Sequence, residues 1–318
     1  MKAWLLDLHR WLGDLHESFL CPFLGGNSGI GKATAVDLAQ RGTRVILACR
    51  YKERGESAVH DVRQESGNSE VILMILDLTF LASEPRLDIL INNAGGGTSF
   101  QVNHLSHFLL THLLLDRLKR CAPSRIVIVA SNFHFFGNID FHTIHKPVKG
   151  LWKSLKSYCN SKLANILHVG ELAKWLEGTN ITCYAVHPGM GLFPISSSSF
   201  LLLSAFSIPP ILSFALLFLR DWKTGAQTII YCATEEGIER LSGQYFVDCQ
   251  PKVPWPQACD DQMAMNLWEF SEMLLGLTTS DRKGRPWKRP RSSWPPRQPW
   301  ACPRSSRSRL GTVVTHQI

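Results

Sequence analysis

Tyr158 and Lys162 are the residues of this chain whose types and spacing most directly suggest chemistry. They are four residues apart, so they share one face if the segment is helical. A free phenol has a pKa near ~10 and is a poor base at neutral pH, but a nearby ammonium stabilises the phenolate and lowers that pKa. We therefore expect Tyr158 to exchange a proton with an alcohol or carbonyl oxygen, while Lys162 tunes its pKa.

Two further polar residues could complete such a site. Ser131 directly follows the apolar run Ile126–Ala130 and would hold the substrate oxygen at the carboxyl end of a strand. Asn103 lies in a long helical stretch and could hold a water that relays protons to Lys162. Tyr and Lys are common on helices, so the pair alone is weak evidence. Its value comes from the order of the motifs around it.

A glycine-rich turn lies upstream between a candidate strand and a helix, and it reads Gly25-Gly26-Asn27-Ser28-Gly29-Ile30-Gly31. Glycines let the backbone approach a pyrophosphate, and a helix N-terminus supplies N–H groups and the positive end of its dipole. By itself the turn could be purely structural. With Tyr158 and Lys162 downstream, it predicts a nicotinamide dinucleotide that exchanges hydride while Tyr158 exchanges the proton.

Arg50 follows the second apolar run, with Lys52 and Arg54 just beyond it. In a dinucleotide-binding fold this position meets the adenosine ribose, where an acidic residue would bind the free 2′-hydroxyl of NAD. A guanidinium suits the 2′-phosphate of NADP instead. Arg50 therefore favours NADP(H), and the alternative is an exposed surface arginine.

The elements that must position these residues alternate between strands and helices. Short apolar runs predict buried parallel strands at Val45–Cys49, Val71–Leu76, Leu87–Ile91 and Ile126–Ala130. Apolar residues at helical spacing predict helices at Gly31–Arg41, Val102–Lys119 and Tyr158–Leu176, the last closed by Gly178. This alternation predicts an α/β fold, a Rossmann-like doubly wound parallel sheet.

One connection in this sheet is unusually short. In a doubly wound sheet the third strand is an edge strand and the fourth lies beyond the first, so the chain must cross the sheet. Only Thr79–Arg86 is available for this. Eight extended residues reach ~27 Å, which allows a taut loop but no covering helix. We therefore expect one crossover helix to be missing.

The ends of the chain differ from its body. Residues 1–20 carry apolar side chains at helical spacing, which predicts an amphipathic helix that either packs on its own domain or lies in a membrane interface. We expect residues 21–277 to form the Rossmann-like domain. Residues 278–318 are basic and rich in Pro, Arg and Ser, which predicts a disordered tail.

Residues 192–219 form a stretch of 28 residues without a charge. The length could suit a transmembrane helix. Pro194, Pro209 and Pro210 argue against a regular span. We favour an apolar segment that covers the substrate or touches a bilayer.

The net charge of +8 comes from the tail. Residues 281–318 hold ten Lys or Arg against Asp281 alone, a charge of +9, which leaves −1 for residues 1–280. The body therefore gives no electrostatic reason to expect a nucleic-acid partner. Nine scattered cysteines indicate a reducing compartment and neither disulfides nor a metal site. Charges throughout the first twenty residues exclude a secretory signal, so we expect an intracellular protein.

The order of these motifs resembles the short-chain dehydrogenase/reductase family. The stretches most similar to its retinol dehydrogenase branch are CRYKERGESAV, LDILINNAG, VNHLSHFLLTHLLL, YCNSKLAN and YAVHPG. The similarity covers roughly residues 23–275. It implies NADP(H), a lipophilic alcohol or aldehyde such as a retinoid, and attachment to an intracellular membrane such as the endoplasmic reticulum. The oligomeric state stays open.

The resemblance also implies site residues. The family's catalytic tetrad corresponds to Asn103, Ser131, Tyr158 and Lys162. Its cofactor contacts correspond to the glycine turn, Tyr158 and Lys162 again, and to Arg50, Asp77, Asn92, Ala94, Gly95, Pro188 and Gly189.

The chain departs from the family's pattern at several places. Leu24 replaces a threonine before the first glycine, and Pro22 falls in the expected central strand, where proline removes a donor. Only seven residues separate Gly95 from Asn103, so Asn103 is expected near a helix end and out of relay position. These departures keep a second hypothesis open. In it, the chain is a catalytically impaired or inactive variant of such an enzyme and acts, if at all, by binding a membrane or a partner.

Overall fold

The computed structural model describes residues 20–49, 51–75, 86–95, 100–146, 149–189 and 222–277. Several predictions from the sequence fall outside these ranges: the amphipathic helix except for Leu20, the segment 192–219 and the tail 278–318. Arg50 and Asp77 also lie outside them. None of the helices within the described ranges is both long enough and apolar enough to span a membrane.

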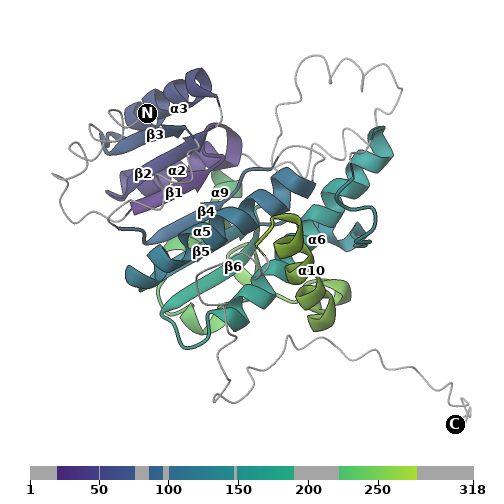
Figure 1. Ribbon diagram of the computed structural model, residues 1–318. Coiled ribbons are helices and arrows are strands. Elements are labelled where there is room, and N and C mark those ends of the chain that lie inside the picture. Colours follow the sequence, from purple (N-terminus) through teal and green to yellow (C-terminus); the bar gives the residue numbers. More distant parts are fainter. Residues whose placement is uncertain are drawn as a thin grey trace, which may run out of the picture.

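Eight strands form one sheet in the order β3-β2-β1-β4-β5-β6-β7-β8 (Figure 1). All neighbours are parallel except β7 and β8. The order of the first six strands is that of a doubly wound dinucleotide-binding sheet, which confirms the predicted fold class. The strands are β1 Leu20–Leu24, β2 Arg44–Cys49, β3 Val71–Ile75, β4 Ile89–Asn92, β5 Ser124–Val129, β6 Ile181–His187, β7 Tyr245–Val247 and β8 Gln250–Lys252.

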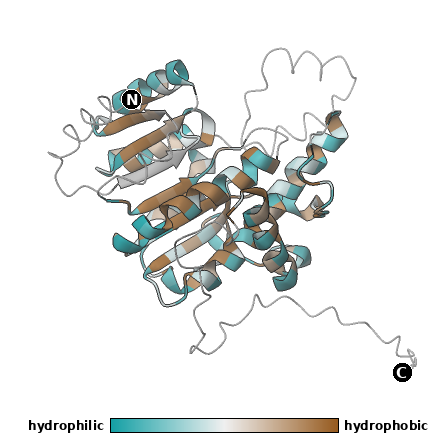
Figure 2. Cartoon of the chain, in the orientation of Figure 1, coloured by the Kyte–Doolittle hydropathy of each residue, from teal (hydrophilic) through white to brown (hydrophobic). Residues whose placement is uncertain are grey.

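Helices cover both faces of the sheet. One hydrophobic core joins the sheet to α2 (Gly29–Gln40), α3 (Lys52–Ser66) and α9 (Trp222–Thr234). The other joins the opposite face to α5 (Ser106–Arg120), α6 (Leu151–Trp175) and α10 (Asp261–Leu274). Figure 2 shows the apolar strands between helices whose hydrophilic stretches face outward. Short helical turns lie at η1 Gln101–Leu105, η2 Asn132–Phe136, η3 Glu239–Leu241 and η4 Pro256–Cys259.

The predicted absence of one crossover helix concerns Thr79–Arg86, of which only Arg86 is described, so it stays a prediction. On the α5 side, the described helices lie over β4, β5 and β6 (Figure 1). None of them is placed between β3 and β4 in the chain. On β3, Ile72 is half-buried, whereas Ile46 on β2 is fully buried.

Pro22 is accommodated within the central strand. It pairs in register with Ile46 of β2, but β1 pairs with β4 only from Phe23 onward. A parallel strand alternates its hydrogen bonds between its two neighbours, so a missing donor shortens the pairing on one side without breaking the strand. The sheet therefore retains its central strand.

Helix boundaries differ from the predicted ones mainly at α6. This helix begins at Leu151, seven residues before Tyr158, and ends near Gly178, which has φ +77° as expected for a glycine after a helix end. The long stretch around Asn103 is two elements, the π-helical turn η1 and then α5. A π-helical turn widens the backbone locally and frequently occurs at functional sites.

Candidate functional site

The glycine turn joins β1 to α2 and packs directly on the loop after β4. Gly25 has φ +87°, and a Cβ there would lie 2.7 Å from the Cα of Ala94. A Cβ on Gly31 would lie 2.1 Å from the carbonyl oxygen of Gly25. Asn93, which the sequence analysis missed, donates from Nδ2 to that same carbonyl at 3.0 Å. Only glycine allows the two loops to approach this closely.

The N-terminus of α2 is open to a ligand. Ser28 is exposed at the cap position, its side chain makes no capping hydrogen bond, and the first turn carries no acidic residue. Asn27, Gly29 and Ile30 are half-buried around it. The free N–H groups and the helix dipole give this turn the properties of an anion-binding site.

Lys162 is buried at the centre of the site. Its Nζ donates to the carbonyl of Val129 at 2.9 Å, where β5 ends, and lies 5.5 Å from the centre of the Tyr158 ring. A Cβ on Gly95 would lie 3.1 Å from the same Nζ. The lysine, the tyrosine and the Ala94–Gly95 loop thus lie close together in the fold.

Ser131 contacts Tyr158 directly. Ser131 caps η2 by accepting from the backbone N–H of Phe133 at 3.2 Å, and its side chain also hydrogen-bonds to Tyr158. Burial raises the pKa of Tyr158, and the bond to Ser131 opposes that rise. Burial also lowers the pKa of Lys162 to about 8. The expected lowering of the Tyr158 pKa is therefore not found here, because desolvation is the largest cause of the shift and raises the pKa.

Asn103 remains in the site despite the short connection before it. It lies in η1, near the start of the helix as expected, yet it is fully buried and donates from Nδ2 to Ser161 Oγ at 3.0 Å. A Cβ on Gly95 would lie 3.5 Å from its Oδ1. The π-helical turn thus places Asn103 beside α6, and its part in a proton relay stays a prediction.

The remaining predicted contacts divide into two groups. Pro188 and Gly189 follow β6, and Gly189 has φ +86°. A Cβ on Gly225 of α9 would lie 3.3 Å from the Pro188 carbonyl oxygen, so this loop packs on α9. Asn92, in contrast, donates from Nδ2 to Thr111 of α5 at 2.9 Å. Its Nδ2 therefore links the sheet to a helix, while its Oδ1 is buried and has no hydrogen-bond partner among the described residues.

Sequence reasoning also missed His104 and Asn165. His104 Nδ1 lies 3.2 Å from Asn165 Oδ1, and Asn165 Nδ2 donates to the carbonyl of Val129 that also accepts from Lys162. Both residues stand inside stretches quoted for the family resemblance, VNHLSHF and YCNSKLAN. Nothing in their local spacing indicates contacts between residues 61 positions apart.

Comparison with known proteins agrees with this geometry. The family model for short chain dehydrogenases matches residues 23–143. Dehydrogenase/reductase SDR family member 13 from Bos taurus is 52% identical over 275 residues, covering 80% of this chain and 72% of that protein. Retinol dehydrogenase 12 from Homo sapiens is 44% identical over 279 residues, covering 80% of this chain and 85% of that protein.

A solved structure shares the fold. The crystal structure of an uncharacterised protein from Mycobacterium paratuberculosis is 28% identical and superposes with a TM-score of 0.63, covering 81% of this chain and 93% of that one. These similarities agree with the sheet order and with the closeness of Tyr158 and Lys162. The chain therefore belongs to the short-chain dehydrogenase/reductase family of oxidoreductases, in its retinol dehydrogenase-like branch.

Proposed function

We propose that the protein is an NADP(H)-dependent oxidoreductase that interconverts a lipophilic alcohol, such as a retinoid, and its carbonyl compound. The observation that carries the proposal is the cluster of Ser131, Tyr158 and Lys162 beside Gly95. These residues come from β5, α6 and the loop after β4, and they meet where carboxyl ends of parallel strands bind ligands in this fold.

The residues around the glycine turn fit a dinucleotide. Gly25 and Gly31 leave no room for side chains, and the open N-terminus of α2 offers N–H groups to a pyrophosphate. Gly95 leaves space beside the Lys162 ammonium, which a Cβ would fill. The bound nicotinamide would supply or accept the hydride. Arg50 is the residue proposed to select NADP(H), by pairing with a 2′-phosphate.

Each side chain then has a defined role. Ser131 would hold the substrate oxygen, and Tyr158 would give a proton to that oxygen during reduction or take one during oxidation. The Lys162 ammonium would stabilise the resulting phenolate, and its hydrogen bond to Val129 holds it in place. Asn103 lies close enough to Gly95 and Ser161 to organise a water for proton return.

The surroundings of Tyr158 suit a lipophilic substrate. The Phe133 ring lies 6.2 Å from the Tyr158 ring in an edge-on arrangement, and the neighbouring Phe136 is 65% exposed. The nearby start of α6 exposes Leu151 and Trp152 at 80% each, beside Lys149 and Lys153. Exposed aromatic and basic side chains together are typical of membrane-interface helices, so we propose that this end of α6 contacts a membrane.

The direct test is reduction of all-trans-retinal with NADPH, compared between the wild-type chain and Tyr158→Phe. Removing the hydroxyl removes the proton donor, so turnover should fall by a factor of about 10² or more. Thermal unfolding checks that the variant is folded. A folded wild-type chain that turns over no aldehyde would refute the enzyme proposal.

That negative result would favour the second candidate, a folded but inactive family member. The observation that supports it is the short connection between β3 and β4, for which the sequence leaves only Thr79–Arg86. Such a protein would retain the membrane surface of α6 without catalysis. The wild-type assay separates the two candidates.

A further inference from the structure

The side-chain amide of Asn165 has only one orientation that satisfies its surroundings. Its Nδ2 lies 3.0 Å from the carbonyl oxygen of Asn103 and 3.1 Å from that of Val129. Carbonyl oxygens only accept, so both hydrogens of the amide are used, and Oδ1 must face His104 as an acceptor. Asn165 and His104 are both fully buried, so no water competes for these bonds.

This arrangement fixes the tautomer of His104. Its Nδ1 lies 3.2 Å from Asn165 Oδ1 and must therefore carry a proton. Burial lowers the pKa of His104 to about 4, so the ring is neutral and its Nε2 is bare. Ser271 Oγ lies 3.1 Å from Nε2 and 2.8 Å from the carbonyl oxygen of Leu267, so its one hydroxyl proton is shared between these two acceptors. An orienting bond on each nitrogen holds the imidazole in one position.

Ser271 belongs to α10, more than a hundred residues further along the chain. The chain of bonds thus runs from α10 through His104 and Asn165 to the Val129 carbonyl, which also accepts from Lys162 at 2.9 Å. Asn165 shares that acceptor with the lysine and so fixes where the carbonyl points. It also holds the backbone of Asn103 in η1.

We propose that His104 is a positioning residue for the oxidoreductase site: by orienting Asn165 it holds the Val129 carbonyl and, through that carbonyl, the Lys162 ammonium. The proposal rests on the proposed function, in which Lys162 supports proton exchange by Tyr158. It assigns His104 no contact with substrate or cofactor. Its role is to keep the ammonium within reach of Tyr158 and Gly95.

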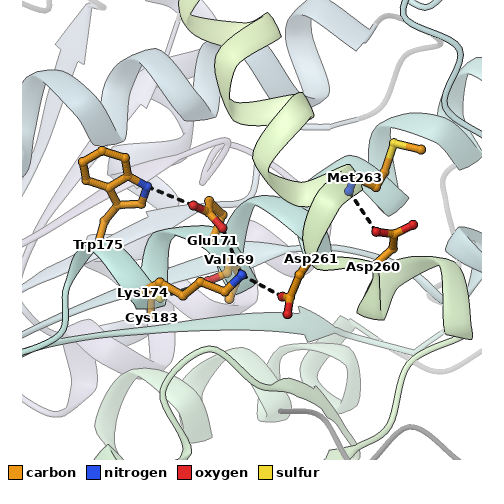
Figure 3. Close-up of polar contacts among 8 residues, drawn as sticks. All are labelled: Val169, Glu171, Lys174, Trp175, Cys183, Asp260, Asp261 and Met263. Atoms are coloured by element: carbon orange, nitrogen blue, oxygen red, sulfur yellow. Dashed lines mark hydrogen bonds and ion pairs between the residues drawn. The ribbon is translucent and has the colours of Figure 1, made fainter. Parts of the chain in front are cut away.

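The other end of α10 offers a matched control. There Asp261 accepts from Lys174 at 2.6 Å, and Lys174 also bonds to buried Glu171, which accepts from the Trp175 indole (Figure 3). Asp261 and Ser271 are ten residues apart, or about 15 Å along the helix. The contact at Asp261 holds α10 on α6 and the contact at Ser271 holds it on η1, and only the contact at Ser271 leads to Lys162. General loosening of α10 can therefore be told apart from loss of positioning.

The test compares kcat, KM and the pH profile of NADPH-dependent retinal reduction in four variants. His104→Leu cannot donate to Asn165, so we expect the Lys162 ammonium to be displaced. A small displacement of a catalytic group commonly lowers the rate by one to two orders of magnitude, so kcat should fall about tenfold or more. KM for both substrates should change much less. His104→Asn keeps a donor near the place of Nδ1 and should restore kcat. Ser271→Ala should lose part of kcat, and Asp261→Asn should lose none.

The pH profile separates positioning from simple damage. The titratable groups against Lys162 are Tyr158 and His107, and neither is altered in these variants. A carbonyl that is no longer held stabilises the ammonium less, so the alkaline limb of kcat should move to lower pH in His104→Leu and return in His104→Asn. Wild-type kcat and an unshifted profile in folded His104→Leu would overturn the proposal, as would equal losses in Ser271→Ala and Asp261→Asn.

Failure of the proposed function would look different. If the wild-type chain itself turns over no aldehyde, the position of Lys162 is read from the pKa of its ammonium, by NMR of the chain labelled with ¹³C-lysine. That pKa should fall in His104→Leu and keep its wild-type value in His104→Asn. An unchanged pKa in His104→Leu would overturn the positioning role independently of any activity.

Discussion

At the scale of single residues, the interior behind Lys162 is unusual for its three buried imidazoles. His104, His107 and His168 are each at most 3% exposed, and the rings of His104 and His168 meet edge to face with centres 5.6 Å apart. Burial lowers the pKa of all three, to about 4 for His104 and about 3 for His107. Each therefore stays neutral in the fold, although an unfolded chain would charge it below pH ~6.5.

His107 gives the clearest test of this linkage. Burial is the largest cause of the lowered His107 pKa, and the Lys162 charge is the second. An interaction with the Ala94 backbone raises the pKa and so opposes both. Neither ring nitrogen has a hydrogen-bond partner of good geometry. The pKa of His107 is lower in the folded state than in the unfolded state. Between pH ~6.5 and ~3 the unfolded chain therefore binds a proton at His107 that the folded chain does not. The free energy of unfolding falls as the pH falls through this range. Between pH 7 and pH 5, this one group should cost about 2 kcal/mol of unfolding free energy.

His107→Leu should therefore flatten the pH dependence of stability by about that amount. Urea unfolding at pH 7 and pH 5 measures the change for both proteins. His60 is exposed on α3, and His60→Leu serves as the control for replacing a histidine that folding does not bury. An equal loss of stability between the two pH values in wild type and His107→Leu would show that His107 does not stay neutral.

At the scale of elements, α6 combines two tasks. Its middle carries Tyr158 and Lys162 into the core, and its later turns bury Leu167 and Leu172 against the sheet and α10. Its first two turns instead expose Leu151 and Trp152 to solvent. A helix that needed only to position Tyr158 would not require these exposed apolar residues. The start of α6 is therefore the element that we expect to meet a membrane.

Trp152→Ser tests this membrane contact. Burial of a large apolar side chain is worth roughly 1.5–3 kcal/mol, so binding to vesicles that contain anionic lipid should weaken about tenfold or more. Leu113→Ser removes another exposed apolar residue, on α5, and should bind like the wild type. Sedimentation with the vesicles measures both. Equal binding of Trp152→Ser and wild type would exclude this end of α6 as the contact.

At the scale of the whole molecule, the sequence predicted what depends on local pattern. The apolar runs located β2 to β5 within about two residues, and the glycine turn was correctly placed between β1 and α2. The start of α6 was missed because residues 151–157 mix Lys and Ser with apolar residues that face solvent. His104, Asn165 and Ser271 could not be predicted, because their roles arise from hydrogen bonds between η1, α6 and α10 that only folding creates.

Whether the whole fold still forms a cofactor site is decided by a ligand acting on the full chain. A cofactor that binds only the folded state adds about 2.7 kcal/mol at 100 times its Kd, which should raise Tm by a few degrees for a domain of this size. NADPH should raise the Tm in this way. Arg50→Asp should reduce the rise in Tm caused by NADPH far more than the rise caused by NADH. Equal losses for both cofactors would refute selection of the 2′-phosphate by Arg50. A cooperative unfolding transition whose Tm NADPH does not change would mean that the sheet forms without a working cofactor site. The absence of any cooperative transition would mean that the shortened crossover after β3 prevents the chain from folding.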